Sequence, residues 1–322
     1  MGRLDHATRG ELDRRIRRGQ PLSLEEEERW LRAGPASAAM EEDLRGRGPE
    51  LDAVVALPYL AATTYFAFRA VPERFFLVPC LHDEPFARLS TTRLMLARAR
   101  GVLFNTAPER ELARRLAPSL ARSAVVGLGF DPPVAADPEA FRARYGVSGP
   151  FAVFVGRLEQ DKNVPLLVRY FLRYQERRRS ELELLLVGGG DVEPPASAQV
   201  RRLSIDWADR DALLGAASLL FQPSLNESLS IVMMQAWLCG TPIMVHAGGE
   251  VSTYHCRRSN GGLWFASYPE FEEMVGRLEA DQELRRALGA NGREYVRREY
   301  GWPAVLDRFE AALGASGVGA GG

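Results

Sequence analysis

From residue 53 onward, short apolar runs alternate with segments of helical periodicity. The apolar runs predict two sets of strands, the first at 53–58, 75–79, 101–104 and 124–128, the second at 151–156, 183–190, 199–205, 217–223, 242–247 and 262–267. Helical patterns occupy 108–118, 164–178, 229–240, 269–281, 283–300 and 304–314. This alternation predicts parallel strands joined by right-handed crossovers, with helices on both faces of each sheet. The predicted fold class is therefore α/β, with two Rossmann-like doubly wound domains.

A stretch rich in proline and small residues, 131–141, separates the two sets of strands and is typical of a linker. We therefore expect a first domain over residues 1–135 and a second over 136–300. The remaining segment, 301–322, is expected to form a helix followed by a flexible tail.

The first 50 residues are dense in charge and have few residues that could fill a core. Ser23 and Glu26 have the spacing of a capping box, which predicts the start of a helix. This region is expected to form surface helices and loops. The sixteen residues 53–68 carry no charge, but a membrane span needs about twenty apolar residues, so a buried strand followed by the start of a helix is favoured.

The 322-residue chain has a formal net charge of −1, which argues against binding to nucleic acid through a general electrostatic field. Its three cysteines are too few and too scattered for a disulfide framework or a zinc site, which suits a reducing compartment. The first nineteen residues are charged and have no apolar stretch, so a secretory signal is not expected. No metal-ligand spacing links His246, His255 and Cys256, so no metal is expected there. A cytoplasmic protein is expected, with docking at the inner face of the membrane left open.

Two loops of the second set have the composition of an anion site. Gly156 ends a predicted strand, and Arg157 and Lys162 follow it at the sheet edge where ligands bind in open α/β folds. Two cations beside a helix N-terminus suit a di- or triphosphate, although a solvated basic pair beside acidic neighbours is an equal alternative. The three glycines 188–190 permit either close approach to a ligand or a plain tight turn.

The segment QPSLNESLSIVMMQAW, 222–237, begins at the same sheet edge and runs into a predicted helix. Its exposed N–H groups are expected to point at an anion, and Glu227 is expected to accept hydrogen bonds from hydroxyls. Gln235 lies ~80° further round the helix, so both side chains can reach one elongated ligand. A carboxylate beside phosphates needs compensation, which Arg157 and Lys162 can supply. The alternative is a plain helix start with an exposed glutamine.

The motifs GRLEQDKN (156–163), PSLNESLSIVMMQAWLCGTP (223–242) and NGGLWF (260–265) together resemble the retaining, nucleotide-sugar-dependent glycosyltransferases of family four. The resemblance covers roughly residues 75 to 314 and implies the two-domain GT-B architecture, with the final helix crossing back to the first domain. It implies that a group of residues binds the donor: Gly156, Arg157, Lys162, Ser228, Leu229, Ser230, Ile231 and Gln235. Glu227 would contact the donor sugar, and Gln235 stands where the family has a ribose-binding glutamate.

The resemblance extends to the first half, where LVPCLHDEPF puts His82 at the family's position near the sugar and leaving group. Asp83 and Glu84 are expected to orient its ring. The catalytic group implied is thus His82, Glu227, Arg157 and Lys162. The family's first strand and glycine-rich loop have no counterpart in the first 50 residues, so the first domain is expected to be incomplete, with about four strands.

The function expected from this resemblance is hexose transfer, with retention, from a nucleotide diphosphate sugar to an acceptor hydroxyl, without a cofactor or metal. The acceptor is left open among a glycan, a lipid-linked molecule and a small metabolite. A partner chain or second copy is one way to complete the first domain. The rival hypothesis is a non-catalytic or partner-dependent nucleotide-sugar-binding homologue. A sugar-nucleotide epimerase is disfavoured, since no acid–base pairs are recognised in the first domain.

Overall fold

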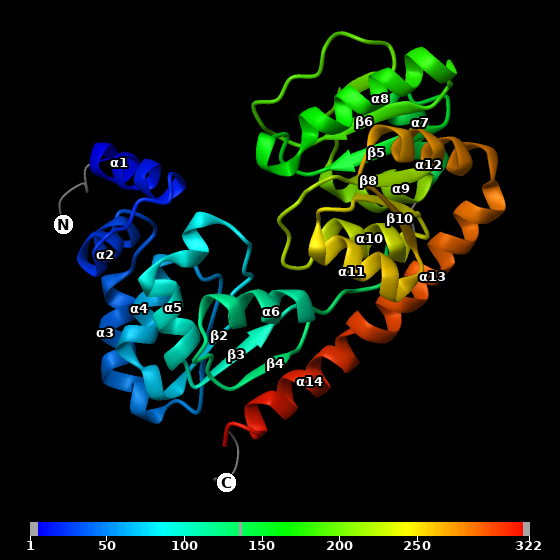
Figure 1. The fold of residues 1–322 in the computed structure, drawn as a ribbon. Helices are drawn as coiled ribbons and strands as arrows, with labels where there is room; N and C mark the ends of the chain where they lie inside the picture. Colours follow the sequence, from blue (N-terminus) through cyan, green and yellow to red (C-terminus); the bar gives the residue numbers. More distant parts are fainter. Residues whose placement is uncertain (1–5, 135–136, 318–322) are drawn as a thin grey trace. The chain divides into compact units, whose positions relative to one another are not determined.

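The computed structural model describes residues 6–134 and 137–317, and the chain divides into two compact units (Figure 1). The first unit comprises Met1–Leu128 with Val305–Gly322, and the second comprises Gly129–Ala304. Each is built on one parallel β-sheet with helices packed against it. The predicted α/β class is confirmed, and each of the ten predicted strands forms.

The first unit contains a four-stranded sheet in the order β1-β2-β3-β4. Its strands are short: β1 Val54–Ala56, β2 Phe75–Leu77, β3 Gly101–Phe104 and β4 Ser123–Val125. The connecting helices are α4 Ala62–Ala70, α5 Ser90–Arg98 and α6 Ala107–Leu116, with 3-10 turns η2 Pro72–Arg74 and η3 Pro85–Arg88. The uncharged run 53–68 therefore forms β1 and the first part of α4, as predicted.

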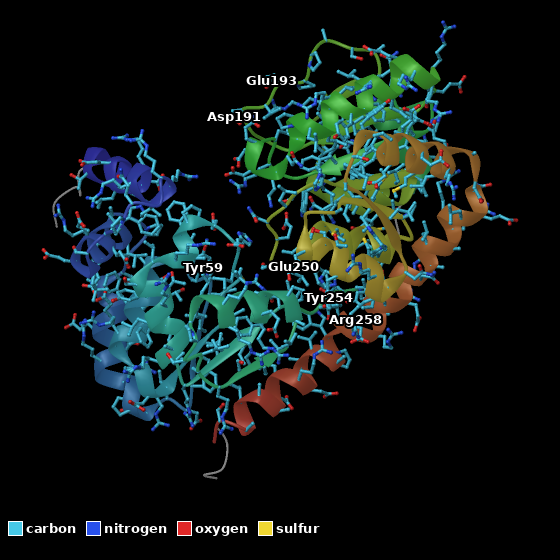
Figure 2. The ribbon with its side chains drawn as sticks, in the orientation of Figure 1. Tyr59, Asp191, Glu193, Glu250, Tyr254 and Arg258 are labelled. Atoms are coloured by element: carbon cyan, nitrogen blue, oxygen red, sulfur yellow. The ribbon has the colours of Figure 1, made fainter. Side chains whose placement is uncertain are left out.

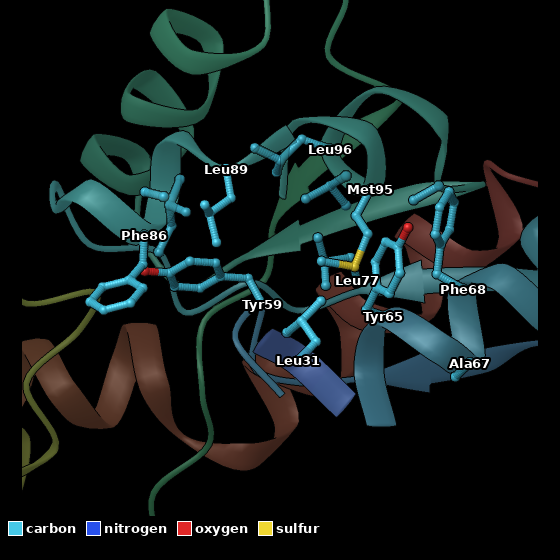
Figure 3. Close-up of a cluster of buried hydrophobic side chains, with 14 of the residues drawn as sticks. Leu31, Tyr59, Tyr65, Ala67, Phe68, Leu77, Phe86, Leu89, Met95 and Leu96 are labelled. Atoms are coloured by element: carbon cyan, nitrogen blue, oxygen red, sulfur yellow. The ribbon is translucent and has the colours of Figure 1, made fainter. Parts of the chain in front are cut away.

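Residues 6–50 form α1 His6–Arg17, α2 Leu24–Arg32, α3 Ala38–Arg47 and the 3-10 turn η1 Gly48–Glu50. The predicted capping box of Ser23 and Glu26 is present at the start of α2. The prediction that this region contributes little to a core is wrong, because it buries a set of apolar side chains: Leu12, Ile16, Trp30, Leu31 and Leu44. Figure 3 shows Leu31 beside Tyr65, Leu77 and Met95 in this core.

A buried carboxylate connects α2 to the rest of the first unit. The two oxygens of Glu27 accept hydrogen bonds from the backbone N–H groups of Ser90 (2.9 Å) and Thr91 (2.8 Å). These groups lie in the first turn of α5, which has no capping side chain of its own. Glu27 therefore satisfies donors that a helix start leaves unpaired and complements its positive end.

The second unit has a six-stranded parallel sheet in the order β10-β9-β8-β5-β6-β7. The strands are β5 Phe151–Val155, β6 Glu183–Val187, β7 Val200–Leu203, β8 Leu219–Gln222, β9 Ile243–His246 and β10 Gly262–Phe265. From β5 the chain first adds strands on one side and then returns to place β8 on the other side. The strand order therefore reverses between β5 and β8, which is where open α/β sheets bind ligands, beyond the carboxyl ends of the strands.

The sheet of the second unit is covered on both faces, because residues along β5 alternate between two cores. Val153 belongs to one core and Phe154 to the other. The helices are α7 Pro138–Tyr145, α8 Val164–Arg178, α9 Arg210–Ala216, α10 Ile231–Cys239, α11 Glu250–Ser259, α12 Tyr268–Ala280, α13 Gln282–Tyr300 and the start of α14 Trp302–Gly314. The 3-10 turns are η4 Gln160–Lys162 and η5 Trp207–Asp209. The later part of α14 packs Phe309 and Leu313 against the first sheet.

The predicted linker 131–141 is partly wrong, because α7 begins at Pro138. The carboxylate of Asp137 accepts hydrogen bonds from the N–H groups of Glu139 and Ala140, and proline occupies the first helical turn. Both features favour a helix start, so the sequence did contain the signal. Residues 135–136 lie outside the described part of the chain.

Candidate active site

Two loops at the reversal point of the second sheet are joined by hydrogen bonds. The side-chain amide of Asn163 donates to the carbonyl oxygen of Pro223 (3.2 Å), which connects the loop after β5 to the loop after β8. Asn163 has φ of 58°, and this left-handed conformation lets the chain turn from η4 directly into α8. The predicted convergence of these two segments on one sheet edge is present.

Lys162 and Glu227 come together in this region. The ammonium nitrogen of Lys162 lies 2.6 Å from a carboxylate oxygen of Glu227, and their side chains are 20% and 12% exposed. A charge-assisted hydrogen bond of this length fixes both side chains. The expected compensation of the carboxylate is therefore supplied by Lys162.

Arg157 adopts a different position from the one expected. Its guanidinium pairs with Glu159 at 2.7 Å, and its side chain is 67% exposed. The neighbour two residues along the chain, and not Glu227, is its carboxylate partner. Arg157 is nevertheless at the carboxyl end of β5, next to Gly156.

Helix α10 begins at Ile231, two residues later than predicted. Ser230 precedes it with φ of 68°, and its hydroxyl accepts a hydrogen bond from the buried amide of Gln222 (2.8 Å). Leu229 is buried and Ser228 lies in the preceding loop. The side chain of Ser230 makes no capping hydrogen bond to this nine-residue helix. The N–H groups at a helix start carry partial positive charge, and those of α10 lie at the reversal point.

A cavity of about 840 Å³ opens at the carboxyl ends of β5, β6 and β7. Three of the predicted site residues line it: Gly156, Ile231 and Gln235. The remaining lining residues are Val155, Val187, Gly188, Gly189, Arg202, Leu203, Ser204, Ile205, Trp207 and Val232. Its volume is in the range of small-molecule sites, and its mostly apolar walls with a few polar groups are typical of them.

The glycine-rich loop after β6 packs tightly against the loop after β5, and it also contributes to the cavity wall. A Cβ at Gly188 would overlap the carbonyl oxygen of Gly156, and a Cβ at Gly190 would overlap that of Leu158. These two glycines therefore allow tight packing between the loops after β5 and β6, where Leu158 donates to the Gly189 carbonyl at 2.8 Å. Gly189 itself has open space where a Cβ would lie and lines the cavity.

The same loop continues with Asp191 and Glu193, which Figure 2 labels. The carboxylate of Glu193 pairs with the guanidinium of Arg202 on β7. Because Arg202 lines the cavity, this ion pair connects the loop to the cavity wall.

His82 lies in the first unit, in the loop that follows β2. Its Nδ1 is 3.6 Å from a carboxylate oxygen of Glu84, which also accepts a hydrogen bond from Tyr59 (2.7 Å). Burial disfavours the charged form of Glu84, but the interactions with His82 and Tyr59 outweigh it and hold the pKa of Glu84 below its usual range. The expectation that Asp83 orients His82 is wrong, since Asp83 pairs with Arg88 at 2.6 Å.

The sequence of the second unit is similar to that of known proteins. Residues 139–295 match the family model described as glycosyl transferases group 1. This segment therefore has the sequence of that family. A D-inositol 3-phosphate glycosyltransferase from Xylanimonas cellulosilytica is 30% identical over 266 residues, covering 73% of this chain and 63% of that protein. For such relatives the match spans only about three fifths of their own length, 63% and 59% in two cases.

Solved structures of glycosyltransferases share the fold. Sucrose-phosphate synthase from Thermosynechococcus elongatus has a TM-score of 0.72 at 19% identity, covering 92% of this chain and 81% of that one. HepE from Anabaena, solved with UDP and glucose, has a TM-score of 0.72 at 15% identity, covering 85% and 81%. The α/β fold with two parallel sheets is thus the GT-B architecture expected from the sequence.

Glu109, which the sequence did not single out, connects two loops of the first unit. Its two carboxylate oxygens accept hydrogen bonds from the N–H groups of Leu81 and Asn105, both at 2.6 Å. Burial raises the pKa of Glu109 to about 8, against the effect of these donors. Glu109 thereby joins the loops after β2 and β3, beside His82. The spacing Thr106-x-x-Glu109 resembles a capping box and could have identified it.

His255 and His246 each have a hydrogen-bond partner within the second unit. His255 is fully buried, and its Nδ1 lies 2.9 Å from the hydroxyl of Tyr295. His246 accepts a hydrogen bond from the N–H of Gly248 (3.0 Å). Within residues 6–134 and 137–317, no cluster of three histidine, cysteine or acidic residues could hold a metal ion. None of the helices in this described part is both long and apolar enough to cross a membrane.

Proposed function

We propose that this protein transfers a hexose from a nucleoside diphosphate sugar to an acceptor hydroxyl, with retention of configuration. The observation that carries the proposal is the arrangement at the reversal point of the second sheet. There, the Lys162–Glu227 pair joins the loops after β5 and β8. A cavity of about 840 Å³ opens at the end of β5 and is also lined by Ile231, the first residue of α10. The cation and the helix N-terminus suit a diphosphate, and the apolar cavity suits a nucleoside.

Each residue then has a role in donor binding. Gln235 is proposed to hydrogen-bond the ribose hydroxyls, because it lines the cavity. Lys162, Arg157 and the N–H groups from Ser228 to Ile231 are proposed to hold the diphosphate. Glu227 is proposed to accept hydrogen bonds from the hydroxyls of the donor sugar. His82 remains a proposed catalytic residue on the family resemblance.

The chemistry proposed is electrostatic. The bond between the anomeric carbon and the diphosphate oxygen breaks, and the acceptor oxygen forms the new bond on the same face of the sugar. The acceptor proton passes to the departing diphosphate. Lys162, Arg157 and the helix N-terminus stabilise the charge that develops on the leaving group, so this mechanism requires no metal or other cofactor.

The test combines nucleoside diphosphate sugars with candidate acceptors, beginning with a phosphorylated polyol because of the name of the inositol phosphate relative. Product formation is expected with one donor. Arg157→Ala and Lys162→Ala are each expected to lower kcat/KM at least 100-fold, about 2.7 kcal/mol, since each removes a charge from the leaving-group site. Arg169→Ala, which changes an exposed arginine of α8, is the control and should leave turnover unchanged. Full activity in either site variant would refute the proposal.

A non-catalytic nucleotide-sugar-binding protein is the second candidate. The observation favouring it is Gln235, an uncharged residue in the cavity where the family resemblance has a glutamate. Binding of a donor measured by calorimetry, without product from any acceptor or hydrolysis of the donor, would favour this candidate over the enzyme.

A further inference from the structure

Trp207 is a large aromatic residue on the wall of the cavity. It begins η5 just after β7, and 60% of its surface is exposed. An indole ring on a cavity wall offers a ligand a large apolar face and one N–H donor.

The ring is held in place by its neighbours. The guanidinium of Arg210 lies 5.2 Å from the centroid of the Trp207 ring. That guanidinium is itself fixed by the carboxylate of Asp211, at 2.7 Å and 2.8 Å. Asp211 is buried and also accepts a hydrogen bond from the N–H of Val134 (3.0 Å). The indole is therefore positioned before any ligand arrives, which reduces the entropy lost on binding.

The cavity around this ring is better suited to a flat, partly apolar group than to a phosphate. Val187, Leu203 and Ile205 contribute apolar walls. The lining side chains with hydrogen-bonding groups besides Trp207 are Arg202, Ser204 and Gln235, and Arg202 already pairs with Glu193. Few side chains are thus available to read the edge of a base, whereas every base offers a π-face for stacking.

We propose that Trp207 stacks on the nucleobase of the donor and supplies affinity for the nucleoside half without selecting the base. This rests on the proposed function, because it assigns one part of the same donor site. Trp207 contributes to binding of the base only, and Lys162 and Arg157 contribute to binding of the diphosphate.

The experiment measures dissociation constants for UDP, GDP and inorganic pyrophosphate by calorimetry on the full chain. Trp207→Ala is expected to weaken both nucleotides about tenfold and to leave pyrophosphate unchanged, because only the nucleotides carry a base. Trp207→Phe retains an aromatic face and is expected to keep most of the affinity. Trp302→Ala is the matched control, since Trp302 is 42% exposed in the same unit but does not line the cavity.

Intrinsic fluorescence provides a second measurement. Stacking on a base is expected to quench Trp207, so UDP should lower the emission of the wild-type protein and of Trp302→Phe. In Trp207→Phe the quench should disappear although UDP still binds. This readout depends on contact between base and indole, so a purely structural role of Trp207 would not produce it.

The outcomes separate the two proposals. Equal affinities of wild type and Trp207→Ala for UDP and GDP would overturn the stacking role while leaving the donor site intact. An equal loss for pyrophosphate and nucleotides would overturn it as well, because it would show a general disturbance of the cavity. Failure of the wild type to bind all three probes would refute the proposed function and the stacking role together.

Discussion

The ammonium of Lys162 lies 2.6 Å from the carboxylate of Glu227, although the two residues are 65 positions apart in the chain. Both side chains are largely buried. Each therefore depends on the other, since an unpaired charge in such a place is costly. A diphosphate that binds Lys162 competes with Glu227 for the same ammonium group.

Replacing Lys162 by methionine is expected to lower the free energy of unfolding by about 1–2 kcal/mol, a value reduced from that of a fully buried pair because both groups keep some exposure. Glu227→Gln alone is expected to destabilise similarly. The double variant should recover most of the loss, because no lone charge remains, while binding of pyrophosphate stays weak without Lys162. Denaturation in urea of the four proteins measures the coupling. If the losses in unfolding free energy of the two single variants simply add in the double variant, Lys162 and Glu227 do not stabilise each other.

Gln235→Glu is expected to tighten binding of UDP about fivefold to tenfold. A carboxylate accepts hydrogen bonds from ribose hydroxyls more strongly than an amide oxygen does, and Gln235 lines the cavity. Inorganic pyrophosphate has no ribose, so its affinity should not improve. Calorimetry measures the dissociation constants of UDP and pyrophosphate for the wild type and the variant. Gln235→Ala, which removes the contact with the ribose, is measured for comparison. Unchanged or weaker UDP binding in Gln235→Glu would contradict the ribose role.

The strands and the shared sheet edge were predictable because parallel strands buried on both faces have nearly continuous apolar sequences. The meeting of Lys162 and Glu227 followed from the rule that strand ends of one sheet share an edge. The pairing of Arg157 with Glu159 could not be predicted from the sequence, because it depends on the backbone conformation between the two residues. The spacing of Thr106 and Glu109 indicates a helix start, but the contact of Glu109 with Leu81 is tertiary and has no local signal in the sequence.

The N-terminal helices show a different limit of sequence analysis. High charge density obscured an apolar stripe formed by Leu12 and Ile16, four residues apart, and by Trp30 and Leu31. Spacing, and not the fraction of charged residues, determines whether a helix can bury one face. A role for Trp207 could not be predicted from the sequence, because a single aromatic residue in a loop has no recognisable pattern. Its position on the cavity wall is visible only in the structure.

Gly188→Ala is expected to destabilise the second unit by about 3 kcal/mol or more, because its methyl group would overlap the Gly156 carbonyl oxygen and its φ of 144° disfavours a side chain. Gly189→Ala is the matched control, since nothing lies within 4 Å of the added carbon. It should cost less than about 1 kcal/mol. Melting temperatures of the two variants test this, and equal effects would show that loop packing does not require Gly188.

Stability is expected to fall with acid because of His255. Burial lowers the pKa of His255 to about 3, with a smaller contribution from Arg258, whereas an unfolded histidine titrates near its ordinary value of 6.5. Between these two pKa values, His255 is protonated in the unfolded chain and neutral in the folded chain. The stability that the neutral His255 contributes is therefore complete above about pH 6.5 and declines at lower pH. The slope is about 1.4 kcal/mol per pH unit. His255→Gln removes the titration but keeps a group that can bond the hydroxyl of Tyr295. The difference in unfolding free energy between wild type and variant should therefore shift by about 2 kcal/mol, in favour of the variant, from pH 7 to pH 5. Parallel stability curves in urea at the two pH values would show that His255 is not held neutral by burial.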